Sequence, residues 1–571
     1  MKINKLQRLL SGALTATVAL TLAASSLFGQ AFYGTVVGTV TDPSASALHG
    51  ATVTLINSGT QERRQGQTDN AGAYQFPNLV PATYRVEVEL TGFKRAAVPA
   101  VEVTVSGTVR ADVIMQLGDM TQSIEVEASA PLLQTENASL SQAVNTRAVQ
   151  ELPVNGRNIL NLAALVPGVV PQGSTEGNAI TGKNVFAAGN YQIGGGIANQ
   201  SATYFDGVPA NAGVGNLTVL VPSPDVVSEF RVQTSSNSAE FGRYAGGVIN
   251  VASKAGSNQF HGSTYEYLRN RVLNANSFFA NANNTGKPAF TQNQFGGTFG
   301  GPVKKDKLFF FAGYEGYRQR QGANFLATVP LTPMYSGDFS GYKNSVGTMI
   351  PIYDPTTQCG KFANAACAKD ANGNPVVIQR TPFAGNIIPP SRINPVAAKM
   401  VAFPIFAKPN QPGAAYTAIG NYTKNATSGG DNDQVNGRFD YNYSEKIRIF
   451  GRFSRWNSGN TPFAPFDNGI YGGDPYSPET FVTTQGVAGV TWLPTSSMVF
   501  DLRASYGRWS YLRVQPFTGI NMNKTFGLPN YFDTQLPILH GIADETSVPS
   551  YSIGNYTPLP GQPGYNNAKI F

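Results

Sequence analysis

One stretch, residues 224–262, constrains the fold more than any other part of the chain. An apolar, β-branched run at Val226–Thr234 predicts a strand, and a polar turn containing Gly242 follows it. Gly246 and Gly247 then lead into a second apolar run, Val248–Ser253. Glycine accepts positive φ angles and close backbone contact, so this region is expected to hold short strands joined by tightly packed turns.

The same turn chemistry occurs upstream, where Asp206-Gly207-Val208-Pro209 follows Tyr204-Phe205. In this order and spacing the segments resemble the plug domain of TonB-dependent outer-membrane receptors. That family has an Asp-Gly-Val/Ile-Pro turn, a Val-Glu-x-[Phe/Val]-x-Val strand, a Tyr/Phe-Gly turn and Gly-Gly-Val-Ile-Asn-Val. The resemblance implies a mixed α/β plug over residues 132–257, with these plug-motif residues: Asp206, Gly207, Gly242, Gly246 and Gly247.

The N-terminus predicts export. Lys2, Lys5 and Arg8 precede a largely apolar run, Leu9–Phe28, which small residues terminate. This pattern predicts a signal peptide over residues 1–31, cleaved after Ala31. A membrane anchor is the alternative, because the run approaches the roughly 20 residues that span a bilayer. The many Ala, Thr and Ser residues, and the lack of a basic flank after the run, favour cleavage.

Charge and composition narrow the partners. The formal net charge is +7, and removal of the three basic residues of the predicted signal peptide lowers it to +4. This net charge gives a weak electrostatic field for so large a protein, and no basic run is interleaved with aromatic residues. We therefore expect no nucleic-acid partner. Charged residues are scarce at 13 %, aromatics reach 11 % and glycines number 61. Such a mixture suits a mainly β chain that presents one face of a barrel to outer-membrane lipid.

Residues 32–118 are predicted to form a small β-sandwich. Residues 68–86 resemble the carboxypeptidase-regulatory-like, prealbumin-type domain, with its D-x-x-G turn, Tyr-x-Phe strand, Leu-x-Pro corner and Tyr-x-Val strand. Ala82 stands where that family usually has Gly. The family's name implies no peptidase activity here. Asp69 and Asn70 are interpreted as turn residues rather than calcium ligands, because no complete calcium loop follows. The predicted strands are Gly34–Thr41, Ala51–Ile56, Arg85–Leu90, Val101–Val105 and Ala111–Leu117.

Residues 119–131 link the sandwich to the plug and contain an alternating apolar and acidic segment. This segment resembles a TonB box, the extended strand that the periplasmic TonB protein binds to pull on such receptors. This segment could bind TonB by strand addition, because main-chain hydrogen bonds to an exposed sheet edge supply affinity and alternate side chains set the register. An ordinary edge strand of the sandwich or plug is the open alternative. The candidate residues are Ile124, Glu125, Val126, Glu127 and Ala128.

Two helices are predicted early in the plug. Thr146–Leu152 stops at Pro153, and Arg157–Val166, capped by Asn155, ends at Pro167-Gly168. Arg157 is expected either to engage the barrel wall or to be a solvated residue at the helix start.

Residues 258–571 have the texture of the first part of a transmembrane antiparallel β-barrel, with a long extracellular loop at about 319–433. The segment Phe299–Phe311 is characteristic of Oar-like receptors that carry the same sandwich. About seven strands are predicted, against about 22 in receptors of this type, so we expect a C-terminally truncated fragment. The predicted strands are Phe260–Arg269, Asn293–Gly301, Lys307–Tyr317, Gln434–Ser444, Lys446–Trp456, Gln485–Leu493 and Met498–Arg513.

The cysteines and histidines point to no metal or cofactor. Cys359 and Cys367 lie close together, and in an exported protein such a pair is predicted to form a disulfide. The three histidines are scattered, and no H-E-x-x-H or G-x-S-x-G motif occurs, so no enzyme is predicted. A secreted metallopeptidase is therefore the weakest hypothesis.

The leading hypothesis is a TonB-driven outer-membrane transporter or receptor. A surface adhesion or structural protein is the main alternative, and only energised transport needs the segment at residues 124–128. The ligand class stays open among oligosaccharides, peptides and metal chelates, because specificity resides in variable loops.

Overall fold

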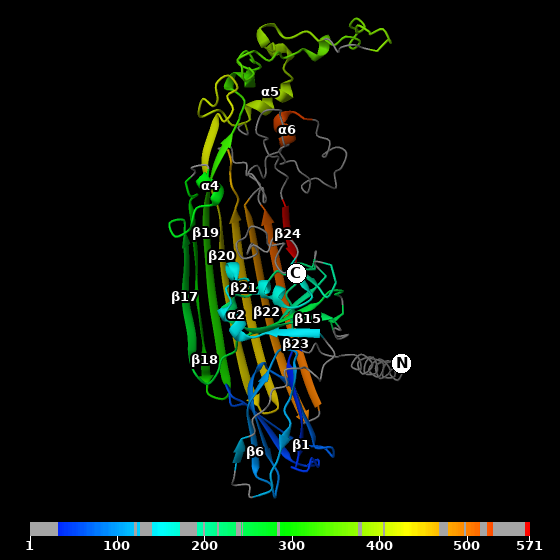
Figure 1. Cartoon of the computed structure of the whole chain (residues 1–571), viewed down its shortest axis with the longest axis vertical. Coiled ribbons are helices and arrows are strands. Elements are labelled where there is room, and N and C mark those ends of the chain that lie inside the picture. The colour runs from blue at the N-terminus through cyan, green and yellow to red at the C-terminus, as the bar shows by residue number, and fades with distance from the viewer. Residues whose placement is uncertain are drawn as a thin grey trace, which may run out of the picture.

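The computed structural model describes residues 32–118, 123–125, 140–171, 191–197, 200–213, 216–235, 241–242, 244–282, 286–374, 380–403, 406–466, 478–495, 498–513, 522–528 and 566–570. The predicted signal peptide lies outside them. Figure 1 shows three units, which are a small β domain at one end, a middle unit and the long sheet behind it, with an irregular loop region at the opposite end of that sheet. No helix in the described part of the chain is long and apolar enough to cross a membrane.

The N-terminal unit is a two-sheet sandwich, as predicted. One sheet contains β4 (Ala73–Leu79), β1 (Gly34–Thr41), β7 (Thr108–Arg110) and β8 (Val113–Ile114). The other has the order β3 (Arg63–Gln67), β2 (Thr52–Asn57), β5 (Ala82–Glu89), β6 (Arg95–Val103) and β9 (Ser123–Glu125). Alternating valines of β1 and β5 fill the core between the sheets. Asp69 accepts the N–H groups of Ala71 and Ala73, so it is a turn residue.

The middle unit, which we call the plug, is built on a five-stranded sheet. Its order is β10 (Leu140–Val144), β15 (Val227–Ser235), β16 (Val248–Ser253), β13 (Ala202–Phe205) and β14 (Val208–Pro209). A small ladder joins β11 (Val169–Pro171) to β12 (Tyr191–Ile193). β15 and β16 are buried along most of their length, which explains their continuous apolar character. The short helices α2 (Thr146–Glu151), η1 (Asn155–Arg157), η2 (Ile159–Leu165) and η4 (Pro224–Val226) flank this sheet.

The second predicted helix of the plug is wrong in form. Gly156 and Arg157 have φ angles of 67° and 54°, which break the segment into two 3₁₀ turns, η1 and η2. Asn158 caps η2 by accepting the N–H of Leu160. The apolar periodicity was sound, since Ile159, Leu160, Leu162 and Ala163 are buried, but periodicity does not reveal a left-handed backbone kink.

The third unit is one eight-stranded sheet in which each strand pairs antiparallel with the next. Along β20, Gln434, Asn436 and Arg438 are buried toward the plug side, while Val435 and Phe439 lie at alternate positions and are exposed. Alternation between a polar inner face and an apolar outer face is typical of the wall of a β-barrel in lipid. The strands are β17 (His261–Asn270), β18 (Phe290–Lys304), β19 (Leu308–Ala327), β20 (Tyr422–Ser444), β21 (Ile447–Thr461), β22 (Glu479–Thr495), β23 (Met498–Arg513) and β24 (Asn566–Ile570).

The long loop between β19 and β20 is shorter than the predicted 319–433. β19 continues to Ala327 and β20 already begins at Tyr422, so both strands extend into the predicted loop. Their extra length carries charged pairs, including Arg318 with Asp433 at 2.8 Å and Arg320 with Asp431 at 2.8 Å. Polar residues on both faces hide a strand from an analysis based on apolar alternation. The described part of the remaining excursion is mostly irregular, with short 3₁₀ turns and the helix α5 (Pro395–Ala402), which packs near α6 (Met522–Phe526). A further short helix, α4 (Phe278–Ala282), lies between β17 and β18.

Candidate functional site

Asp206 occupies the turn between β13 and β14 and is fully buried between the plug and the wall. Asp206 and Gly207 have φ angles of 51° and 77°, as a two-residue Asp-Gly hairpin requires. A β-carbon on Gly207 would collide with the guanidinium of Arg503 on β23. The motif glycine therefore permits both the turn and a close approach to the barrel.

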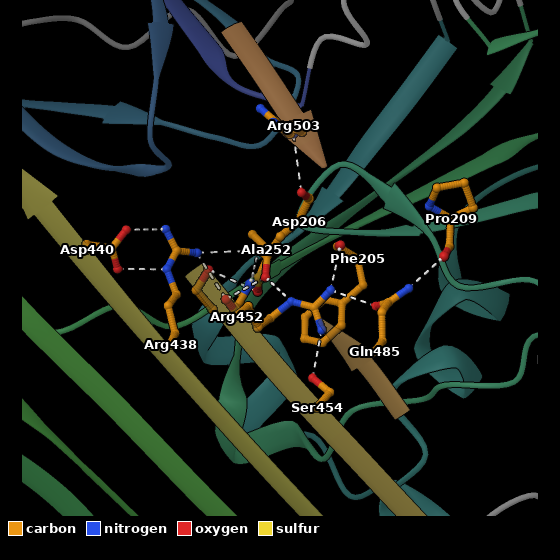
Figure 2. A network of polar contacts seen from close by, with 12 residues as sticks. Phe205, Asp206, Pro209, Ala252, Arg438, Asp440, Arg452, Ser454, Gln485 and Arg503 are labelled. Carbon is orange, nitrogen blue, oxygen red and sulfur yellow. Dashed lines mark hydrogen bonds and ion pairs between the residues drawn. The ribbon is translucent and has the colours of Figure 1, made fainter. Parts of the chain in front are cut away.

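The Asp206 carboxylate is held by groups from both units (Figure 2). Ser253 of β16 donates to it through its backbone N–H at 2.9 Å and its hydroxyl at 2.8 Å. From the wall, Arg452 Nε lies 2.8 Å and Arg438 Nη1 3.4 Å from its oxygens. All three charged side chains are nearly inaccessible to solvent, so their attraction is weakly screened and the cost of breaking it is high. We call Asp206, Arg438 and Arg452 the ionic lock.

The lock arginines have further partners that fix their positions. Arg438 makes two hydrogen bonds to Asp440, at 2.8 and 2.7 Å. Arg452 donates to the Phe205 carbonyl at 3.0 Å and to Gln485 at 2.7 Å, and it lies 3.8 Å above the Phe205 ring. Gln485 in turn donates to the Pro209 carbonyl at 2.8 Å. Polar groups of the wall thus hold the plug turn, next to an apolar contact of Val208 with Phe450 and Val487.

Arg157 forms a second contact between the plug and the wall. Its guanidinium bonds to Asp225 within the plug and to the buried Glu315 of β19 at 3.1 Å. It also lies over the rings of Tyr265 and Tyr267 of β17, at 4.4 and 5.0 Å. Of the two alternatives that the sequence left open, the structure shows engagement with the wall.

The remaining motif glycines serve close packing inside the plug. A β-carbon on Gly247 would lie 2.5 Å from the Gln233 carbonyl oxygen, and one on Gly246 would lie 2.7 Å from Ser201 Oγ. Gly242 follows Phe241, whose ring packs 5.5 Å from that of Tyr204. These glycines shape the sheet that carries Asp206 and do not themselves contact the wall residues of the lock.

Glu229 and Arg231 of β15 join the plug to the sandwich. Val105 donates its N–H to Glu229 and accepts Arg231 Nε at 2.7 Å, while Thr104 Oγ1 accepts Arg231 Nη2 at 2.7 Å. Burial raises the pKa of Glu229 to about 7, against the opposing effects of the Val105 N–H and of Arg231, and Glu102 adds to the rise. The unfolded chain has the lower pKa of an ordinary glutamate, so the protonated form favours docking.

Docking of the sandwich on the plug is therefore expected to weaken as pH rises from about 5 to 8. Protonated Glu229 stabilises the docked sandwich fully at a pH below the pKa that this side chain has in the unfolded chain. That stabilisation is lost as pH rises through its folded pKa of about 7. Thiol labelling of Ser106→Cys in the full-length protein, normalised to a free thiol at each pH, should become faster above pH 7. Glu229→Gln should flatten this dependence, and an unchanged slope in that variant would contradict the assignment.

The structure also places the other predicted site residues. Ile124 and Glu125 lie in β9, which pairs parallel to β6 at the edge of the sandwich, whereas Val126, Glu127 and Ala128 lie outside the described residues. Cys359 and Cys367 are bonded to each other in the loop region, with their Cα atoms 4.8 Å apart. Sequence reasoning missed the lock arginines, although inward polar residues alternating with outward aromatics, as in Arg438-Phe439-Asp440, offered a signal.

The disulfide gives a direct prediction. Non-reducing peptide mapping of protein taken from the cell envelope should recover one cross-linked peptide pair containing Cys359 and Cys367. The bond closes a short loop, so the double variant Cys359→Ser, Cys367→Ser should make this loop more sensitive to protease added to whole cells. The amount of barrel inserted in the membrane should stay unchanged. Recovery of both residues as free thiols would contradict the pairing.

Comparisons with known proteins agree with this geometry. Residues 252–570 match the family model of the outer membrane beta barrel domain, and residues 35–116 match that of the carboxypeptidase regulatory-like domain. The chain is 27 % identical over 315 residues to the TonB-dependent transporter Oar of Myxococcus xanthus, covering 51 % of this chain and 28 % of that protein. It therefore spans less than a third of the length of this curated relative.

Two solved structures are similar to parts of the chain. The outer membrane transporter YddB from Escherichia coli matches with a TM-score of 0.40 and 11 % identity, over 66 % of this chain and 39 % of that one. The siderophore receptor PirA from Acinetobacter baumannii matches with a TM-score of 0.35 and 15 % identity, over 66 % and 41 %.

Proposed function

Because this chain belongs to the outer membrane beta-barrel family, as an Oar-like TonB-dependent receptor, we propose that it imports a nutrient through a plug-gated barrel. The protein resides in the outer membrane. Its plug, its polar barrel lining and its N-terminal sandwich would then be parts of one transport machine. The proposal assigns no catalytic chemistry to the chain. The relative identified by the comparison is likewise a transporter.

The observation that carries the proposal is the polar seat of the plug. Buried ion pairs and hydrogen bonds join Asp206 and Arg157 to the wall, beside apolar contacts such as that of Val208 with Phe450 and Val487. The polar contacts can exchange their bonds for water when the plug moves, whereas the apolar contacts lose their hydrophobic stabilisation, which energy coupling would have to supply. The seat therefore suits a plug that is held firmly and yet released reversibly.

The proposal assigns energy coupling to Ile124–Ala128, with periplasmic TonB as the partner. Strand addition needs unpaired backbone N–H and C=O groups, and in this structure part of the segment forms β9 and is paired with β6. The segment would leave the sandwich edge to pair with TonB. Because β9 is only three residues long, few ladder bonds oppose that exchange.

The ligand would enter from the side of the long loop region, residues 328–421. Long loops on a rigid wall are where such scaffolds carry specificity. Oligosaccharides, peptides and metal chelates are the ligand classes that we propose to test. In the described part of the chain, no cluster of three or more His, Cys, Asp or Glu side chains could hold a metal ion.

Uptake by living cells tests the proposal. A strain lacking the gene, and the same strain complemented with the full-length protein, would be given labelled oligosaccharides, oligopeptides and ferric chelates in turn. We expect complementation to restore uptake of one class, and a protonophore to abolish that uptake. Normal uptake of every class by the deletion strain, or surface adhesion as the sole lost property, would reject the proposal in favour of the adhesion hypothesis.

A further inference from the structure

The sandwich contacts the plug through a closely packed surface. Besides the Glu229 and Arg231 contacts, Asn250 Nδ2 lies 3.3 Å from Ser106 Oγ. Beside these polar contacts, an apolar cluster joins the N-terminal segment of the sandwich to plug strand β16, and its buried members are Phe32, Tyr33, Val105 and Ala252. Arg231 is only 1 % exposed and Glu229 is also buried, so the polar contacts that these two residues make with the sandwich are shielded from water.

The sandwich also contacts the barrel rim, at the end of the sheet opposite the long loop region (Figure 1). Arg448 of β21 donates to the Asn78 carbonyl at 2.6 Å and lies 3.5 Å from Glu62. Asn78 Nδ2 donates to Asp501 of β23 at 3.2 Å. A backbone bond of 3.0 Å runs from Asn258 to Gly59. The sandwich therefore bridges the plug and the barrel.

The two contact surfaces differ in packing. A cavity of about 560 Å³ opens between the sandwich, the plug and the rim. Its polar lining includes the side chains of Glu62, Lys254, His261, Asp440 and Arg448. Contacts beside a cavity of this size are exchanged for water more easily than the buried surface around Arg231.

Arg503 connects the bridge to the ionic lock. Its Nη1 donates to the Asp206 carbonyl at 3.2 Å, and its guanidinium lies over the rings of Tyr33 and Phe32 at 4.4 and 5.2 Å. Asp501, which accepts Asn78 of the sandwich, pairs with the same arginine at 3.0 Å. A movement of the Asp206 turn would therefore disturb the sandwich contacts on the rim directly.

We propose that the sandwich is a latch across the periplasmic mouth of the barrel: it must leave the rim, while staying on the plug, before the plug can move. This inference rests on the proposed function, because it assumes energised movement of the plug. It assigns the carboxypeptidase-regulatory-like domain a mechanical role. The rim contacts of Arg448, Asn78 and Gly59 are the bonds that break, and those of Glu229 and Arg231 are the bonds that persist.

Two matched disulfides test the latch in the full-length protein. Gly59→Cys with Ser257→Cys ties the sandwich to the connection between plug strand β16 and barrel strand β17, since a β-carbon on Gly59 would lie 3.8 Å from that of Ser257. The next residue, Asn258, fixes this connection to the barrel rim by donating to Asp306 at 2.7 Å. Ser106→Cys with Asn250→Cys ties the sandwich to the plug. Both pairs are placed in a Cys359→Ser, Cys367→Ser background. A reporter, Ala212→Cys, is added in the plug, where Ala212 packs against wall residues Phe481 and Trp509.

Each pair is oxidised in cells treated with a protonophore, and a fluorescent maleimide is then added after respiration is restored. We expect the sandwich–barrel disulfide to reduce reporter labelling to the level of protonophore-treated cells, and a reductant to restore it. The sandwich–plug disulfide should leave labelling at the level of the reporter alone.

Full labelling despite the sandwich–barrel disulfide would overturn the latch, and so would a block by the sandwich–plug disulfide. If the reporter alone is labelled equally with and without respiration, the proposed function fails and the latch fails with it. These results are distinguishable because the reporter protein without added pairs is measured in every experiment.

Discussion

Asp206→Ala is expected to unseat the plug in the absence of energy. The substitution leaves Arg452 and Arg438 buried opposite an empty position, and it removes both hydrogen bonds from Ser253. Removing one partner of a buried pair costs about 3–5 kcal/mol. Arg438 keeps Asp440, so we expect the lower end, about 3 kcal/mol, which corresponds to roughly a hundredfold more unseated plug. Maleimide labelling of Ala212→Cys in protonophore-treated cells measures this population.

Two further variants make the Asp206 prediction specific. Asp206→Asn keeps hydrogen-bonding capacity but loses the charge, so it should give intermediate labelling. Asp431→Ala removes a comparable ion pair with Arg320 at the solvent-exposed outer ends of β19 and β20. Such exposed pairs contribute about 0–1 kcal/mol, so this variant should leave labelling unchanged. Equal labelling of Asp206→Ala and the parent would show that the lock does not hold the plug.

Val126→Pro is expected to abolish energised movement of the plug. Proline has no N–H and fixes φ, so a strand that pairs with TonB through its backbone cannot tolerate it. Val126→Ala keeps the donor and should be milder. Reporter labelling in respiring cells should fall to the protonophore level in Val126→Pro, while the amount of protein at the surface stays normal.

Other outcomes for Val126→Pro separate the two interpretations of this segment. Full labelling would place the coupling segment elsewhere, including ahead of the sandwich. Loss of folded protein from the membrane would make residues 124–128 an ordinary structural strand, an extension of the observed pairing of β9 with β6.

Local patterns predicted much of the fold. The bounds of β1 and β23 agree with the sequence expectation, because both strands have β-branched or aromatic alternation and clear turns. Prediction failed where the backbone depends on distant contacts. Arg157 takes a positive φ angle while bonding to Glu315, a residue 158 positions away. The outer ends of β19 and β20 were missed because charged residues interrupt their apolar pattern.

The candidate site was predicted only in part. Turn chemistry identified Asp206 and Gly207, since an Asp-Gly pair between apolar runs has a local meaning. Their partners on the wall are more than 200 positions away, so no local pattern links them to the turn. Likewise, Glu229 and Arg231 look like alternate residues of a strand, and only the structure reveals that they hold Val105 of the sandwich.

The most direct measurement of the central claim is energy-dependent exposure of the plug. Full-length protein carrying the Ala212→Cys reporter, in the Cys359→Ser, Cys367→Ser background, would be exposed to maleimide in respiring cells, in protonophore-treated cells and in cells lacking TonB. Plug-gated transport driven by TonB predicts labelling in respiring cells alone. Equal labelling under all three conditions would contradict it.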